Sequence, residues 1–297
     1  MHITILASRG KMPPLPNISA FIKSQHIDVV EKVDLPVPTT LADCRCAQRW
    51  YLEAIPTDLD LKVWPDLGLE DHVDVNFQSA MDSIADIKLA VFDMDSTLIQ
   101  CEVIDQLADQ AGVGAEVSAI TEQAMRGELD FSQSFAERLG LLKGLDSGVV
   151  QQLANELPLT DGGKELILTL KTRGIKTVIL SGGFDVFAER VASELGMDDY
   201  YANKLHTRAG ALTGEVITPI VNAEFKEAKL RELASGMGID MRQTMAVGDG
   251  ANDLNMLNAA GIGIAFRAKP AVRLRARYRL QMVGLDGALH LIGNQND

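Results

Sequence analysis

The sequence predicts an α/β fold, in which a doubly wound, Rossmann-like parallel sheet with an inserted helical cap follows a small α+β module. From Lys88 onward, short β-branched or apolar runs alternate with longer helical patterns, which is typical of a parallel sheet with helices on both faces. Before that point the pattern differs, because seven of the ten prolines lie within residues 1–85. Such frequent interruption favours a module of short strands and helices.

We therefore divide the chain into an N-terminal module, residues 1–85, and a core, residues 86–297. The module is expected to contain a strand at residues 3–7 and a helix near residues 18–24. The predicted strands of the core are short, and they comprise residues 89–92, 176–180, 245–248, 263–266 and, more weakly, 278–281.

Two insertions interrupt the alternating pattern of the core. Residues 102 to about 158 show helical periodicity, for example at Val103, Ile104 and Leu107, without a strong strand. This segment is expected to form the helical cap. A smaller insertion is expected at residues 200–216, where Arg208-Ala209-Gly210 can turn a β-hairpin.

Composition and charge exclude several classes of protein. The formal net charge of -13 argues against a nucleic-acid partner, because such binding requires clustered Lys and Arg. No apolar run reaches the roughly 20 residues of a membrane helix, and the N-terminus lacks the features of a signal peptide. The three cysteines, Cys44, Cys46 and Cys101, form neither a disulfide framework nor a complete zinc site. We expect a cytoplasmic protein without a membrane partner, and the oligomeric state stays open.

Two carboxylates follow the first predicted strand of the core directly. Residues 93–98 read DMDSTL, so Asp93 and Asp95 lie where a buried strand ends in a loop. Open α/β sheets bind their ligands at this edge. One carboxylate of such a pair can act as nucleophile while the other exchanges protons. The alternative is a pair of acids that caps turns and the next helix.

Further chemical groups follow later strands of the core. Residues 181–183 read SGG and precede a helical run, which offers a hydroxyl and two backbone amides for a phosphate. Lys226 lies in the first turns of a predicted helix, where a solvated lysine is the simpler interpretation. Residues 248–253 read GDGAND and again follow a strand. Carboxylates from two neighbouring strand ends suffice to hold Mg²⁺, which prefers oxygen ligands.

The order of these motifs resembles that of the haloacid dehalogenase-type (HAD) phosphatases, over about residues 86–295. The wider set of residues, which adds Glu102, Arg138 and Phe184-Asp185, is similar to the phosphoserine phosphatases of that superfamily. The resemblance implies hydrolysis of O-phospho-L-serine to L-serine and phosphate, in the last step of serine biosynthesis, with Mg²⁺ as cofactor.

The resemblance also implies a role for each site residue. Asp93 is the nucleophile that forms an aspartyl phosphate, and Asp95 is the general acid and base. The Mg²⁺ ligands are the Asp93 carboxylate, the Asp95 backbone carbonyl and Asp249, with Asp253 as outer support. The remaining substrate-binding residues are Ser181, Gly182 through its amide, Lys226 and Asn252 for the phosphate end, and Glu102 and Arg138 for the ammonium and carboxylate of serine.

Several alternatives stay open at this point. Met125 and Phe131 resemble positions that close the cap over the site, but ordinary packing within the cap would explain them equally well. The same motifs would serve a phosphotransferase that passes phosphate from phosphoserine to another alcohol. A catalytically silent phosphoserine sensor is the third alternative, although it would not need Asp95. Members of the family often have an N-terminal regulatory module that resembles the ACT fold, and residues 1–85 have a suitable length.

Overall fold

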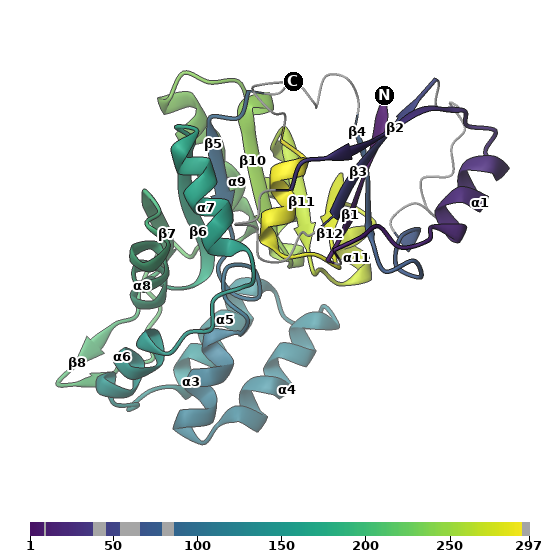
Figure 1. Ribbon diagram of the computed structural model, residues 1–297. Coiled ribbons are helices and arrows are strands. Elements are labelled where there is room, and N and C mark those ends of the chain that lie inside the picture. Colours follow the sequence, from purple (N-terminus) through teal and green to yellow (C-terminus); the bar gives the residue numbers. More distant parts are fainter. Residues whose placement is uncertain (9, 38–45, 54–65, 79–85, 293–297) are drawn as a thin grey trace.

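The computed structural model describes residues 1–8, 10–37, 46–53, 66–78 and 86–292 of the chain. These residues form a six-stranded parallel sheet flanked by helices and a separate four-stranded antiparallel sheet near the N-terminus (Figure 1). The expectation of a parallel α/β core preceded by a smaller α+β unit is therefore confirmed. Cys44 lies outside the described residues, and Cys46 and Cys101 are free thiols.

The parallel sheet has the strand order β12-β11-β10-β5-β6-β7. From the central pair of strands, the chain continues outward from β5 to β6 and β7 on one side, and from β10 to β11 and β12 on the other. The strand order therefore reverses between β5 and β10. Open α/β sheets bind ligands at such a reversal, outside the carboxyl ends of the strands. The strands are β5 (Leu89–Phe92), β6 (Lys176–Phe184), β7 (Asp199–Asn203), β10 (Thr244–Gly248), β11 (Ile262–Phe266) and β12 (Tyr278–Leu280).

Strand β5 is buried on both faces of the sheet, as its unbroken apolar run requires. Ala90 and Phe92 pack into one hydrophobic cluster, while Leu89 and Val91 pack into another. Alternate side chains of a strand point to opposite faces of the sheet, so helices must cover both faces. The helices of the core are α7 (Gly163–Thr172), α8 (Asp185–Leu195), α9 (Ala223–Gly236), α10 (Leu254–Ala259) and α11 (Pro270–Arg273).

Strand β7 corrects the prediction of an insertion over residues 200–216. Its sequence, Asp-Tyr-Tyr-Ala-Asn, is half-buried at the edge of the sheet, and it therefore lacks the apolar run that marked the other strands. The hairpin prediction is confirmed, because β8 (Thr207–Arg208) pairs with β9 (Ala211–Leu212). Ala209 and Gly210 between them both have positive φ, as expected for the commonest two-residue hairpin turn.

Four helices lie between β5 and α7 in the segment predicted as a cap. Figure 1 shows α3 and α4 as a layer below the sheet, beside its carboxyl edge, with α5 and α6 between this layer and the core. We call these four helices the cap. They are α3 (Val103–Ala111), α4 (Gly114–Met125), α5 (Phe131–Leu141) and α6 (Ser147–Asn155).

The N-terminal sheet packs against the edge of the core that ends in β12. Its order is β2-β3-β1-β4, with antiparallel pairing and helix α1 (Pro16–Ser24). Strand β4 lies beside β12 of the core, and Asn76 exchanges two hydrogen bonds of 2.8 and 2.9 Å with the backbone of Arg279. The strands are β1 (His2–Ala7), β2 (Val29–Leu35), β3 (Cys46–Leu52) and β4 (Asp74–Gln78).

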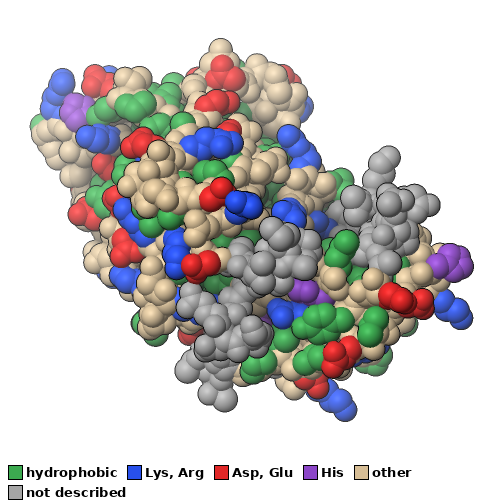
Figure 2. Space-filling view, turned by 90° about the horizontal axis from the view of Figure 1, so that it is seen from above, with side chains coloured by type: hydrophobic (Ala, Val, Ile, Leu, Met, Phe, Trp, Pro, Cys, Tyr) green, Lys and Arg blue, Asp and Glu red, His purple; other side chains and the backbone are tan. Residues whose placement is uncertain are grey.

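The surface mixes charged and apolar side chains. On the described part of the face in Figure 2, acidic and basic side chains alternate, although the whole chain has 41 acidic and 28 basic residues. Among the described residues, no helix is long and apolar enough to cross a bilayer.

Candidate active site

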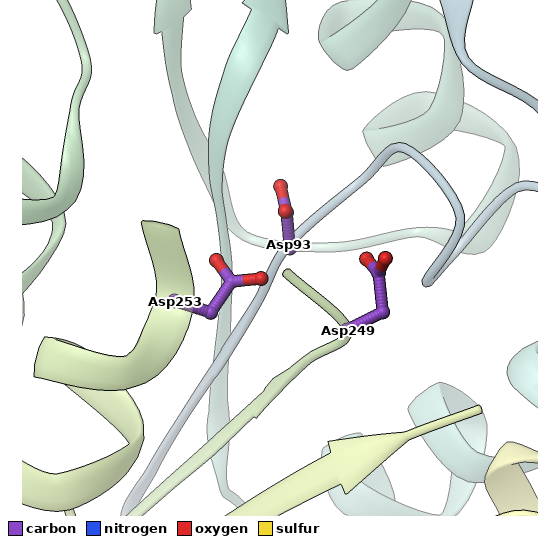
Figure 3. Close-up of side chains that lie close together, drawn as sticks. All are labelled: Asp93, Asp249 and Asp253. Carbon is purple, nitrogen blue, oxygen red and sulfur yellow. The ribbon is translucent and has the colours of Figure 1, made fainter. Parts of the chain in front are cut away.

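Three carboxyl groups meet where the strand order of the parallel sheet reverses. Asp93 follows β5 and its backbone N–H donates to the carbonyl of Val247 in β10 over 2.9 Å, so the two strand ends are held in register. Asp249 directly follows β10, and Asp253 ends the short 3-10 helix Ala251–Asp253 that leads into α10. Figure 3 shows the three carboxyl groups side by side, and one oxygen of each lies within 4.8 Å of the other two.

Lys226 is the cation at the centre of this cluster. Its ammonium lies 2.9 Å from Asp93 Oδ1 and 2.7 Å from Asp253 Oδ1, and its side chain is 0% exposed. Helix α9 positions it, since Asn222 caps the helix by accepting from the N–H of Phe225. The interpretation as a solvated lysine is therefore wrong. Burial lowers the pKa of Lys226, but Asp253 and Asp93 outweigh burial and raise it above its ordinary value.

The acids around Lys226 carry more negative charge than one ammonium can neutralise. Burial raises the pKa of Asp93 well above its ordinary value, and Asp253 adds to the effect. Burial likewise raises the pKa of Asp249 to about 7, with contributions from Asp253 and Glu102. Crowded carboxylates of this kind, offering only oxygen atoms, suit a hard divalent cation such as Mg²⁺. The donor set therefore fits the metal that the sequence predicts.

Asp95 lies beside the cluster in a different hydrogen-bonding environment. Its Oδ1 accepts from the N–H of Val103 over 2.8 Å, and its Oδ2 accepts from the Ser181 hydroxyl over 3.3 Å. Asp95 thus caps α3 as well as facing the site. Burial, reinforced by Glu102, raises the pKa of Asp95 to about 7, which suits a group that must both donate and accept a proton near neutral pH.

The Ser181-Gly182-Gly183 segment differs in one respect from its prediction. β6 continues through Phe184, and the N–H of Gly183 donates to Ser181 Oγ over 2.9 Å. One of the two expected amides is thus engaged inside the segment. Glycine is required at 183, since a β-carbon there would collide with the Asp95 carboxyl group, and the ring of Phe131 packs against Gly182.

Glu102 precedes the first helix of the cap, and Arg138 lies in its third helix, α5. Glu102 occupies the N-cap position of α3, but its side chain does not cap the helix and instead accepts from the Ser96 hydroxyl over 2.7 Å. Arg138 is half-buried in α5. Burial lowers its pKa, whereas Asp105, Glu102 and Asp95 raise it. The charges of Glu102 and Asp95 therefore act on the Arg138 guanidinium, and Arg138 is not a solvated helix arginine.

Two residues of the site had no predicted role. Thr97 is fully buried and donates to Asp249 Oδ1 over 3.1 Å, which orients that carboxylate. Its position inside the DMDSTL run was the available signal. Asn203, at the end of β7, contacts the Gly182 segment and was hidden within the predicted insertion. Asn252 lies between Asp249 and Asp253 in sequence, and its side-chain oxygen is folded against Gly250.

Comparison with known proteins places the core in one family. The family described as haloacid dehalogenase-like hydrolase matches residues 87–261. The phosphoserine phosphatase SerB2 of Mycobacterium tuberculosis is 47% identical over 76% of this chain and 56% of its own length. The phosphoserine phosphatase of Streptococcus thermophilus is 50% identical over 65% of this chain and 89% of its own length. The match thus spans little more than half of the mycobacterial relative.

Solved structures extend the likeness to the N-terminal sheet. A HAD family hydrolase from Salmonella enterica superposes with a TM-score of 0.82 and 31% identity, covering 99% of this chain and 100% of its own. A phospho-aspartyl intermediate analogue of phosphoserine phosphatase has a TM-score of 0.66 and 40% identity, covering 69% of this chain and 99% of its own. On its sequence motifs, fold and relatives, the chain belongs to the haloacid dehalogenase-like hydrolases.

Proposed function

We propose that this chain is a Mg²⁺-dependent phosphatase that hydrolyses O-phospho-L-serine to L-serine and phosphate. The main supporting observation is the position of Asp93, which lies at the end of the central strand with Lys226 at 2.9 Å and Asp249 beside it. The relatives that share this core are phosphoserine phosphatases.

Asp93 acts as the nucleophile in this proposal. Its Oδ1 accepts from the N–H of Met94 over 2.7 Å and contacts Lys226, so the carboxylate is held in one orientation. An oxygen of Asp93 attacks the phosphorus atom, the bond to the serine oxygen breaks, and an aspartyl phosphate forms. Splitting hydrolysis into two displacements in this way lowers each barrier. The related structure with a phospho-aspartyl analogue is consistent with this intermediate.

Asp95 moves the protons of both steps. In the first step its carboxyl group donates a proton to the departing serine oxygen. In the second step the resulting carboxylate removes a proton from the water that attacks the aspartyl phosphate. A pKa of about 7 makes both protonation states accessible near neutral pH.

Mg²⁺ would be held by the carboxylates of Asp93 and Asp249 and by the backbone carbonyl of Asp95, with Asp253 as outer support. When bound, it neutralises charge between the anionic nucleophile and the anionic phosphate. The chain's own donors toward the phosphate oxygens are the Ser181 hydroxyl, the Gly182 amide, Lys226 and the Asn252 side chain. These donors stabilise the charge that develops during transfer.

Glu102 and Arg138 give the proposed preference for serine. Glu102 pairs with the substrate ammonium, and the Arg138 guanidinium binds the substrate carboxylate. Met125 and Phe131 close the cap over the bound substrate. Met125 is 65% exposed while its sulfur lies 3.8 Å from the ammonium of Lys269, which precedes α11 in the core, so the cap already contacts the core beyond β11.

Phosphate release from a panel of small phosphomonoesters, with and without Mg²⁺, tests the proposal. O-phospho-L-serine should be the preferred substrate and chelation of the metal should stop its turnover. Phosphate transfer to an added alcohol in preference to water would favour the phosphotransferase alternative. Binding of phosphoserine without turnover would favour the sensor.

Substitution of Arg138 tests the substrate preference. Arg138→Ala should reduce kcat/KM for phosphoserine by roughly 10²-fold or more, because a bidentate charged contact is lost, while hydrolysis of an aryl phosphate changes little. Arg190→Ala, which removes a half-exposed arginine of α8 paired with Glu194, is the matched control. Equal losses on both substrates would contradict the assigned role.

A regulatory, ACT-like role for residues 1–85 stays a proposal that rests on the family resemblance alone. Inhibition of the full chain by L-serine, compared with a chain lacking these residues, is the corresponding measurement. Equal inhibition of both proteins would exclude the module as the serine site.

A further inference from the structure

Asn203 connects two segments that carry proposed phosphate-binding groups. It is the last residue of β7 and is 2% exposed. Its side-chain Nδ2 donates to the carbonyl oxygen of Gly182 over 2.8 Å, and its Oδ1 accepts from the N–H of Val221 over 2.8 Å. Both polar atoms of the carboxamide are therefore used, one on each segment.

The bond to Gly182 orients the last residues of β6. The pairing register of β6 with β7 shifts between Leu180 and Phe184, so the side chain of Asn203 contributes a hydrogen bond within the irregular stretch. The Gly182 carbonyl and the Gly183 N–H belong to one planar peptide unit. Asn203 holds the oxygen of this unit, and Ser181 Oγ accepts from its N–H over 2.9 Å. The carboxamide thus also constrains the Ser181 hydroxyl.

The bond to Val221 holds the entry to α9. The next residue, Asn222, caps this helix, and Lys226 lies one turn inside it. The backbone oxygen of Val221 also faces Gly182, at 3.5 Å from the position of a β-carbon there. Asn203 therefore lies between the Gly182 segment and the helix of Lys226, and it contacts both through buried hydrogen bonds.

We propose that Asn203 is a positioning residue that sets the spacing between the Ser181-Gly182 segment and Lys226, and thereby the affinity of the site for the phosphoryl group. This inference rests on the proposed phosphatase function. An error of about 1 Å in such a constellation can cost roughly 10²-fold in rate, so loss of the carboxamide should act on phosphate binding and turnover together.

Asn203→Asp tests the donor half of the contact without changing the size of the side chain. The carboxyl group can still accept from the Val221 N–H. When it is ionised, its second oxygen faces the Gly182 carbonyl and repels it; when it is protonated, its O–H restores the donated bond. The variant should lose roughly tenfold to 10²-fold in kcat/KM near pH 8, and the ratio of variant to wild type should rise as the pH falls.

The pH profile is read as that ratio because other ionisable groups lie near the segment in both proteins. These groups are Asp95 beyond Ser181, Asp185 at the start of α8, which accepts from the N–H of Leu205, and Lys226. Asn203→Ala removes both bonds without adding a charge. It should show a loss of similar size at every pH, together with a roughly tenfold weaker inhibition by inorganic phosphate.

Asn76→Asp is the matched control. Asn76 is 1% exposed and makes the same kind of bond pair, donating to the Arg279 carbonyl and accepting from the Arg279 N–H, but at the contact of the two sheets. It should lower the thermal stability as Asn203→Asp does, while leaving the inhibition constant of inorganic phosphate unchanged.

The outcomes separate this inference from the proposed function. An inactive wild-type protein that also fails to bind inorganic phosphate would refute the phosphatase. An active wild type whose Asn203 variants keep normal phosphate inhibition, or whose Asn203→Asp defect is the same at every pH, would overturn the role of Asn203 alone. Equal effects of Asn76→Asp and Asn203→Asp on phosphate inhibition would also overturn it.

Discussion

Two regions of the molecule bury acidic side chains, and they neutralise them in different ways. At the contact of the two sheets, Asp74 is 2% exposed and accepts from three consecutive backbone N–H groups, those of Gln281, Met282 and Val283, over 2.6 to 3.0 Å. At the end of β5, Asp93 and Asp253 share the ammonium of Lys226, and Asp249 lies beside them.

The difference shows what a buried carboxylate needs in order to be structural rather than reactive. Asp74 has a complete set of hydrogen-bond donors, so it fastens the N-terminal sheet to the loop after β12. The cluster at Asp93 has too few positive groups for its acids, and it is therefore suited to binding a cation and a phosphate. The two regions should respond in different ways to substitution and to metal.

Asp93→Asn should separate the two regions most strongly. Turnover should fall by roughly 10⁴-fold or more because the proposed nucleophile is lost, whereas the metal-free protein should melt at a higher temperature because a like charge leaves a crowded site. Phosphate release and thermal unfolding measure the two effects. Asp240→Asn, at an exposed acid, should change neither, and near-normal activity of Asp93→Asn would refute the nucleophile assignment.

Asp74→Ala should give the reverse result. Three N–H groups, one buried and two part-buried, would lose their acceptor, and a buried unpaired group costs about 1 to 3 kcal/mol, so the free energy of unfolding should fall by roughly 3 kcal/mol. Urea denaturation measures this loss. Asp66→Ala breaks the more exposed pair with Arg273 at 2.8 Å and should cost no more than about 1 kcal/mol. Equal losses would show that the three amides are not decisive.

Mg²⁺ should stabilise the wild type but not a variant whose cluster is incomplete. At a hundredfold excess over its Kd, a ligand that binds only the folded state adds about 2.7 kcal/mol. Thermal melts of the wild type and of Asp249→Asn, with Mg²⁺ and with a chelator, test this. The same increase in both proteins would place the ion elsewhere.

The smallest predicted effect is the contribution of Asp74 to the pH dependence of stability. Burial raises the pKa of Asp74 to about 6, against the three N–H donors that lower it, while the unfolded value lies near 4. The native state then binds more protons between these values, so its free energy of unfolding should fall by about 2 kcal/mol as the pH rises from 4 to 6. Asp74→Asn cannot titrate, and the difference between its pH profile and that of the wild type should isolate this slope. Parallel profiles would contradict the raised pKa.

Most of the core was predictable because its strands are buried on both faces and therefore read as apolar runs. The boundaries of β5 agree with the prediction, and α8 begins at Asp185 as expected. Strand β7 escaped prediction since an edge strand with half-buried tyrosines shows no such run. The error concealed Asn203, whose side chain acts only through contacts with Gly182 and Val221.

The sequence by itself determined that Asp93, Ser181 and Asp249 lie at one edge of the sheet, because each is at the carboxyl end of a parallel strand and these ends lie on the same side. Only the tertiary structure decided which charges meet there. Its packing of α9 against the strand ends buries Lys226 between Asp93 and Asp253. It also surrounds Asp74 with amides from residues more than 200 positions away. Local patterns specify strands and turns, whereas the neutralisation of a buried charge depends on partners that only the packed chain brings within a hydrogen bond.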